Sequence, residues 1–294
     1  MAPVWEAALA GEAASDSDID IDALWPTLGY LCGLRSEARV PLVTGLEGLS
    51  PTADDLKGFA AAFGTSAQSP LFHLAGHTPE AAEAAAALLA ATGAAAAAEG
   101  GAARPRAHEV VELGAAELRG AFATLDSGGA DAVQLVSLGT PHFSLDEVAT
   151  LARLLRGATQ HEGASLVVTT GRQTLEAARE AGHAAELEAF GATLVSDTCW
   201  CMLGRPVVPP EATTLITNSA KYAHYAPGLV GCEVRFASLA GCAMAATTGR
   251  APLARPAWLG GGGGAMGGVG ARAIHTLARP ATRAVARAAV WRWR

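Results

Sequence analysis

Five cysteines are the residues of this sequence most able to bind a soft metal: Cys32, Cys199, Cys201, Cys232 and Cys242. Their thiolates are the usual ligands of iron–sulfur clusters, and they also bind zinc. Cys199 and Cys201 flank a tryptophan just after a predicted strand, whereas Cys242 falls in the first turn of a predicted helix, where the helix dipole favours a thiolate. There is no CxxC pair, so buried, inert cysteines remain an alternative, and the odd number argues against a disulfide framework.

The segment Asn218-Ser219-Ala220-Lys221 offers a second chemistry, the binding of an anion. A helix that begins here would present backbone N–H groups, and Lys221 would add an ammonium group. In such positive surroundings Ser219 is a candidate base, provided that its pKa is lowered. The alternative is a helix cap followed by a solvated lysine. The chain has only two lysines, and the other, Lys57, is expected to pair with acidic residues of its own helix.

Arg172 and three histidines follow other predicted strands. Arg172, in the run TTGR, could hold a carboxylate with both arms of its guanidinium group, or it could be an ordinary surface arginine. His73, His77 and His142 could supply ligands of a zinc site together with a cysteine, or they could be ordinary loop or hydrogen-bonded core residues. The sequence leaves both alternatives open.

The elements that must position these residues alternate between strands and helices. Strands are predicted at 71–74, 108–113, 131–136, 165–169, 193–196, 213–217 and 233–236. Helices are predicted after Thr78-Pro79-Glu80, at 115–125, after the capping box that starts at Ser144, at 173–181 and after Ser238. This alternation predicts an α/β fold with βαβ units and a mainly parallel sheet. Ligands of such sheets bind beyond the carboxyl ends of the strands, so the candidate residues are expected to gather at one sheet edge.

Charge is unevenly distributed along the chain, which carries a net charge of −7 over 294 residues. All 28 acidic residues lie within 1–259, so this acidic part is not expected to bind nucleic acid. Residues 260–294 contain a glycine run and only basic charges, and we expect a linker and a basic tail outside the fold. No run of about 18 apolar residues and no secretory signal is evident, so we expect a cytoplasmic protein without a membrane span.

Several long motifs give the sequence a family resemblance. They are FGTSAQSPLFHLAGHTPE, LVSLGTPHFSLDEV, DTCWCM and TNSAKYAHYAPGLVGCEVRFASLAGC. From about Asp22 to Leu259, the chain resembles the large, catalytic domain of aconitase X, a family of the aconitase superfamily of iron–sulfur dehydratases. The resemblance implies that residues 1–259 are the C-terminal portion of that domain, shortened at the N-terminus.

The resemblance also implies a reaction, the elimination of water from a small hydroxy acid. The substrate expected from it is cis-3-hydroxy-L-proline, with mevalonate 5-phosphate as the alternative. Cys199 and Cys242 match two implied cluster ligands, and a third ligand is expected outside this chain. In this scheme Ser219 is the base candidate, and the substrate anions are held by Lys221 and other polar residues. The other polar residues expected to hold the substrate are Arg172 and Asn218. The three histidines His73, His77 and His142 are expected to protonate the departing hydroxide or to line the pocket.

Two further expectations concern partners and competing functions. The family implies a small swivelling domain or subunit as a partner. An inactive fragment of such an enzyme and a zinc hydrolase are the competing interpretations.

Overall fold

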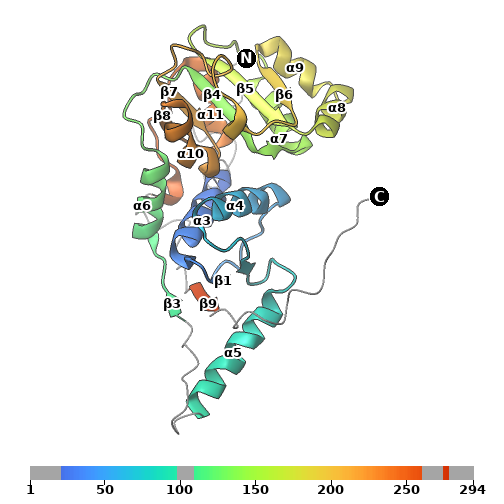
Figure 1. Cartoon of the computed structure of the whole chain (residues 1–294). Coiled ribbons are helices and arrows are strands. Elements are labelled where there is room, and N and C mark those ends of the chain that lie inside the picture. The colour runs from blue at the N-terminus through green and yellow to red at the C-terminus, as the bar shows by residue number, and fades with distance from the viewer. Residues whose placement is uncertain (1–20, 98–108, 260–273, 278–294) are drawn as a thin grey trace.

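The computed structural model describes residues 21–97, 109–259 and 274–277, which form two sheets with helices packed against them (Figure 1). The strands are β1 Val40–Val43, β2 His73–Leu74, β3 Glu109–Val111, β4 Leu135–Phe143, β5 Ser165–Thr170, β6 Thr193–Ser196, β7 Thr214–Thr217, β8 Glu233–Phe236 and β9 Ile274–Leu277. The α-helices are α3 Ile21–Ser36, α4 Ala53–Ser66, α5 Ala81–Ala97, α6 Ala115–Leu125, α7 Leu145–Leu155, α8 Arg172–Glu180, α9 His183–Phe190, α10 Ala220–Val230 and α11 Leu239–Thr248. The short 3-10 helices are η1 Trp200–Met202 and η2 Ala257–Leu259.

The larger sheet has five strands in the order β6-β5-β4-β7-β8, and every neighbouring pair is parallel. The predicted α/β class with mainly parallel strands is therefore confirmed. The chain moves outward from β4 through β5 to β6 and then returns to place β7 on the other side of β4. The strand order thus reverses between β4 and β7, and a crevice for ligands forms at such a point.

The two faces of this sheet belong to different cores. Successive strand residues point to opposite faces, so Leu135 and Leu215 pack in one core while Val136 and Ile216 pack in the other. The second core lies against α7, α8, α9 and α11. The first core continues through α6 and α10 into α3 and α4, so one continuous core joins the parallel sheet to the helices below it in Figure 1.

Helices α3 and α4 pack unusually closely because glycines of α3 face the backbone of α4. A Cβ atom on Gly29 would lie 2.2 Å from the carbonyl oxygen of Phe59, and one on Gly33 would lie 2.7 Å from that of Phe63. The N-terminus of α4 carries a capping box, in which Thr52 accepts from the backbone N–H of Asp55 and donates to its carboxylate. The first turn of α4 is therefore fixed in place, with Asp54 and Lys57 near it.

Strand β4 differs from its predicted extent and contains an irregularity. The sequence predicted a strand at 131–136, with His142 in the segment that follows it, yet β4 runs from Leu135 to Phe143. Its register with β5 shifts between Leu138 and Phe143, so the segment 139–142 bulges from the ladder. Gly139 makes the bulge possible: its φ is +97°, and a Cβ atom there would lie 2.0 Å from the carbonyl oxygen of Thr169.

The smaller sheet has the order β2-β1-β9-β3, and β9 is antiparallel to both of its neighbours. Residues 274–277 thus form a strand within the segment 260–294 that we expected to lie outside the fold, while the rest of that segment lies outside the described residues. The domain boundary at 259 stays a prediction. Thr78 was expected to cap α5, but the helix starts at Ala81, and the hydroxyl of Thr78 instead accepts from the backbone N–H of Leu74.

No helix within the described ranges is both long and apolar enough to cross a lipid bilayer.

Candidate active site

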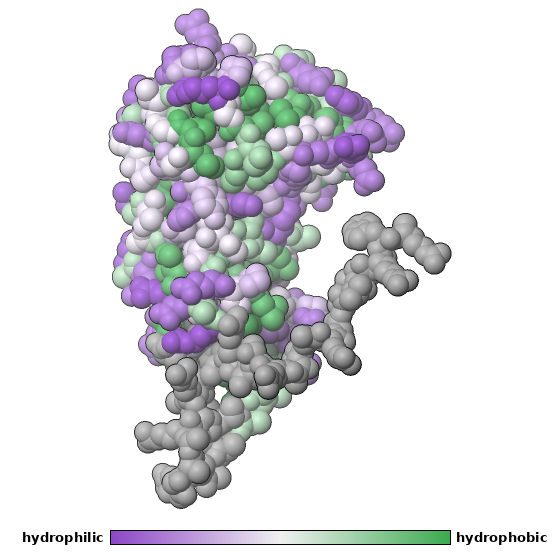
Figure 2. Space-filling model, viewed as in Figure 1, coloured by the Kyte–Doolittle hydropathy of each residue, from purple (hydrophilic) through white to green (hydrophobic). Residues whose placement is uncertain are grey.

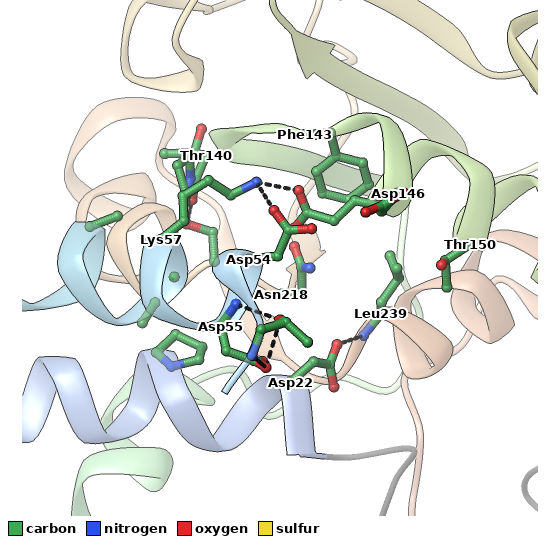
Figure 3. A pocket seen from close by; sticks show the side chains of 18 of the residues that line it. Asp22, Asp54, Asp55, Lys57, Thr140, Phe143, Asp146, Thr150, Asn218 and Leu239 are labelled. Carbon is green, nitrogen blue, oxygen red and sulfur yellow. Dashed lines mark hydrogen bonds and ion pairs between the residues drawn. The ribbon is translucent and has the colours of Figure 1, made fainter. Parts of the chain in front are cut away.

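A cavity of about 610 Å³ lies where the strand order of the parallel sheet reverses, between the carboxyl ends of β4 and β7 (Figure 3). One wall comes from α3 and α4, with Pro26, Asp55 and Gly58. The other comes from the bulge of β4, from one side of α7 and from the first turns of α10 and α11. Segments far apart in the sequence thus meet where the topology predicts a ligand site.

The lining of this cavity carries more acidic than basic side chains. The acidic ones are Asp22, Asp54, Asp55, Asp146 and Glu147, and the basic ones are Lys57, Arg153 and Lys221. Asp22 also holds the start of α11, because its Oδ2 accepts from the backbone N–H of Leu239 at 2.7 Å. The two walls are therefore joined by hydrogen bonds across the cavity.

Lys57 joins the walls most directly. Its Nζ lies 2.8 Å from Oδ1 of Asp54 and 2.5 Å from Oε2 of Glu147, and it donates to the carbonyl oxygen of His142 at 3.1 Å. Asp54 also accepts from the hydroxyl of Ser144, the N-cap of α7, at 2.7 Å. The predicted pairing of Lys57 with an acid of its own helix is confirmed. Its second partner on α7 and its place in a cavity wall had no signal in the sequence.

Within this cluster, burial changes the pKa of Glu147. The pKa of Glu147 is raised above its ordinary value of 4.5, chiefly because the carboxylate loses solvent, and the ammonium group of Lys57 opposes that rise.

Ser219, the predicted base, serves as the N-cap of α10. Its Oγ accepts from the backbone N–H of Tyr222 at 3.0 Å and donates to the carbonyl oxygen of Thr140, and the residue is 5% exposed. Both functions of this hydroxyl are therefore engaged within the protein. Asn218 and Lys221, on either side of the cap, line the cavity as well, so three of the predicted site residues come together here.

Thr140 also lines this cavity, and sequence reasoning did not single it out beyond its place in a polar loop. The residue is 3% exposed, and its Oγ1 has no hydrogen-bond partner among the described residues. Buried polar groups without a partner are rare in folded proteins, and they often face a ligand or water.

Arg172 and His142 lie at the same sheet edge but outside the cavity lining. Nε of Arg172 is 2.5 Å from Oδ2 of Asp197, and the Arg172 side chain is 74% exposed. The pKa of Asp197 is lowered, first by the backbone N–H of Arg172 and then by its guanidinium group. Nε2 of His142 lies 3.1 Å from the carbonyl oxygen of Thr198, next to Cys199. Their predicted roles stay predictions.

His73 lies in the smaller sheet and His77 follows its strand β2, and neither lines the cavity. His73 is a buried residue of β2, and its Nδ1 has no partner among the described residues. Nε2 of His77 lies 2.8 Å from the carbonyl oxygen of Leu46, and its ring packs edge-on against Trp25. The structure therefore does not bring these two histidines together with Ser219 and Lys221.

Comparison with known protein families decides what kind of site this is. Residues 12–122 match the model of the aconitase X second domain, and residues 133–248 match that of the aconitase X third domain. The chain belongs to the aconitase X family. The cavity is lined by residues of both matched ranges, so in this member of the family it lies between the second and third aconitase X domains.

Curated relatives of this aconitase X chain are named dehydratases. A cis-3-hydroxy-L-proline dehydratase of Pseudomonas aeruginosa is 52% identical over 238 residues, which are 81% of this chain and 39% of that protein. One of Hypocrea jecorina is 43% identical over 79% of this chain and 37% of that protein. The phosphomevalonate dehydratase large subunit of Methanothermobacter thermautotrophicus is 34% identical over 70% of this chain and 45% of that protein. The chain thus spans about two fifths of the length of the two most similar of these relatives.

A solved structure supports the same fold. The holo-form of aconitase X from Thermococcus kodakaraensis has a TM-score of 0.61 and 24% sequence identity, covering 78% of this chain and 53% of that one.

The aconitase X family implies an iron–sulfur cluster, for which the thiols of this chain are the candidate ligands. Cys199 and Cys201 are partly exposed neighbours, and the pKa of Cys201 is raised by burial and by Cys199, while Lys221 opposes the rise. Cys242 is fully buried in the core that the sheet forms with α7, α8, α9 and α11, and both burial and Asp22 raise its pKa, which disfavours the thiolate. Within the described ranges, no three His, Cys, Asp or Glu side chains are grouped to hold a metal ion. The described residues therefore do not fit a three-thiolate cluster by themselves, and the same finding gives the zinc alternative no support.

Proposed function

We propose that this chain forms part of a hydro-lyase that eliminates water from cis-3-hydroxy-L-proline. The observation that carries the proposal is the cavity at the strand-order reversal, where Asn218, Ser219 and Lys221 meet the acidic and basic side chains of α4 and α7. The 52% identity to the Pseudomonas aeruginosa dehydratase supports the reaction class and the substrate.

The charge of the lining favours an amino-acid substrate over a phosphorylated one. Five carboxylates face three cationic side chains, and the ammonium group of Lys57 is already shared between Asp54 and Glu147. A phosphate ester with two negative charges would be repelled by such a lining, whereas a zwitterion presents an ammonium group as well as a carboxylate. Mevalonate 5-phosphate is therefore the alternative substrate, favoured only by the more distant relatives.

The described residues suggest what this chain contributes to the reaction. Elimination breaks one C–H bond and one C–O bond, so the substrate must be held with both bonds in a fixed orientation. Lys221 and Asn218 would bind the carboxylate at the start of α10. A base role for Ser219 stays a prediction, because its hydroxyl proton is directed to the carbonyl oxygen of Thr140.

A partner domain or subunit is part of this proposal. Large apolar side chains lie exposed on η1 and α10, which contact each other: Met202 is 81% exposed and Leu229 is 50% exposed. Figure 2 shows apolar side chains at the surface of the part built on the parallel sheet, bordered by hydrophilic ones. Exposed apolar surface of this kind is typical of a contact with another protein unit, and the small aconitase X domain or subunit is the partner we expect.

The experiment combines this chain with the portion of the Pseudomonas aeruginosa dehydratase that it does not match. The mixture is supplied with iron and sulfide together with cis-3-hydroxy-L-proline or mevalonate 5-phosphate, and NMR follows the loss of the signal from the carbon that bears the hydroxyl group and the appearance of the unsaturated product. We expect turnover of the former only. Turnover of mevalonate 5-phosphate alone would reverse the substrate assignment, and no turnover of either would overturn the proposed function.

A further inference from the structure

We propose that the hydroxyl group of Thr140 binds the carboxylate of the substrate, together with Asn218 and Lys221 at the start of α10. This inference rests on the proposed function for the identity of the substrate. Thr140 belongs to the bulge of β4, whereas the other two residues follow β7, so the site bridges the two strands between which the strand order reverses.

The first argument is the state of the hydroxyl group itself. Thr140 is 3% exposed and lines the cavity, yet its Oγ1 has no partner among the described residues. By contrast, the hydroxyl groups of Thr169 and Thr170, at the end of β5, donate to the carbonyl oxygens of Gly139 and Phe143 at 2.7 and 2.6 Å. Unlike these two hydroxyl groups, that of Thr140, which belongs to a residue of the cavity lining, is not used within the described part of the protein.

The second argument is that the Thr140 segment is held from both sides. The carbonyl oxygen of Thr140 accepts from the Ser219 hydroxyl, and two residues later the carbonyl oxygen of His142 accepts from Lys57 at 3.1 Å. One contact comes from α10 and the other from α4, so the bulge cannot shift without breaking a contact to one of these helices. A hydroxyl group fixed in this way orients a ligand at little cost in entropy.

The third argument is the chemistry of the surroundings. The amide of Asn218, the ammonium group of Lys221 and the positive end of the eleven-residue helix α10 all favour an anion. The carboxylates gather on the remaining walls, with Asp54 and Asp55 on α4 and Asp146 on α7 (Figure 3). A cyclic amino acid can therefore direct its carboxylate toward Thr140 and its ammonium group toward the acidic side.

The test measures the binding of L-proline to the full chain by titration calorimetry. L-proline has the carboxylate and the ring ammonium group of the proposed substrate but no hydroxyl group to eliminate, so its binding is independent of turnover. We expect Thr140→Val to weaken L-proline binding about tenfold or more, because a hydrogen bond to a charged group is lost. Thr140→Ser, which keeps the hydroxyl, should stay within about threefold of the wild type.

Two controls make the test specific. Thr170→Val removes a buried hydroxyl that is already bonded to Phe143 and lies outside the cavity lining, and it should leave binding unchanged. Pyrrolidine lacks the carboxylate, so any binding of it should be the same in the wild type and in Thr140→Val. If the valine variant does not fold, Thr140→Ala takes its place.

The inference and the proposed function fail in different ways. Equal L-proline affinity in the wild type and in Thr140→Val, or no binding by the wild type, would overturn the carboxylate site whatever the activity. Normal binding effects without any elimination of water would leave the carboxylate site in place and overturn the dehydratase.

Discussion

Two ion-pair clusters stand at the carboxyl edge of the parallel sheet, one enclosed and one exposed. In the enclosed cluster Lys57 joins Asp54 on its own helix to Glu147 on α7, and all three side chains are less than one third exposed. In the exposed cluster Arg172 pairs with Asp197 at the same 2.5 Å that separates Lys57 from Glu147, but the arginine side chain is 74% exposed. Because solvent screens the exposed pair and not the enclosed one, equal distances imply unequal energies.

The clusters also differ in what they connect. Lys57 lies in the range matched by the second aconitase X domain, and Glu147 lies in that matched by the third, so this ion pair holds the two walls of the cavity together. Arg172 and Asp197 both lie within the third domain and connect the ends of β5 and β6. Four predictions test this difference, from the largest expected effect to the smallest.

Loss of Lys57 should have the largest effect on stability. Lys57→Met keeps the length of the side chain but leaves the partly buried carboxylates of Asp54 and Glu147 without their cation. We expect the free energy of unfolding to fall by about 2–3 kcal/mol, somewhat less than for a fully buried pair. Urea denaturation followed by tryptophan fluorescence measures it, and a change no larger than that of Arg172→Met would contradict the comparison.

The reaction rates of the thiols should also differ between exposed and buried positions. Cys199 and Cys201 are partly exposed near the exposed cluster, whereas Cys32, Cys232 and Cys242 are buried. Buried thiols react only when the structure opens, so we expect two fast thiols and three that react about a hundredfold more slowly with an aromatic disulfide reagent. The Cys199→Ser and Cys201→Ser variants should each lose one fast thiol. Rapid reaction of Cys242 would show that its core is open.

The pKa values of two carboxyl groups should be shifted in opposite directions. Burial raises the pKa of Glu147 above 4.5, so its contribution to stability is largest at low pH and declines as the pH rises through its folded-state pKa. Hydrogen bonds from Arg172 lower the pKa of Asp197 below 3.8, so its contribution is present at higher pH and is lost as the pH falls through its folded-state pKa. Carboxyl ¹³C NMR of the full chain follows both groups, with Glu147→Gln and Asp197→Asn to assign the signals. If the pKa values of Glu147 and Asp197 were shifted in the same direction, the difference between the enclosed and the exposed cluster would be contradicted.

Loss of Arg172 should have the smallest effect. Because the guanidinium group is mostly solvated, Arg172→Met should lower the free energy of unfolding far less than Lys57→Met does, and the remaining effect should shrink further in high salt. The same urea titration at low and high salt measures it. A loss as large as that of Lys57→Met would show that Arg172 is held more rigidly than its exposure implies.

Local patterns in the sequence predicted most of the third domain. The capping box at Ser144, the cap at Ser238 and the strand at 233–236 are confirmed, because these signals act through neighbouring residues only. Asn218, Ser219 and Lys221 line the cavity at the carboxyl end of β7, where parallel topology places residues that follow a strand, and their predicted roles stay predictions.

Contacts between the two domains could not be predicted in this way. The link from Lys57 to Glu147 spans 90 positions, and neither residue carries a signal of the other. The bulge of β4 was missed because residues 139–142 contain a glycine and a proline, which are typical of a loop, whereas here the irregular segment lies inside a strand that resumes at Phe143. The predicted meeting of Cys199 and Cys242 at one cluster stays a prediction, because the third ligand that the family resemblance implies is expected outside this chain.

The glycine at the start of the β4 bulge limits how this site can be redesigned. A single added carbon at Gly139 would meet the main chain of β5, and the residues that it displaces are the ones that carry the Thr140 hydroxyl and the Lys57 contact. Substrate range can therefore be altered at the side chains around the cavity, but position 139 should stay fixed in any mutant library. The shape of the pocket therefore depends on the absence of a Cβ atom at Gly139.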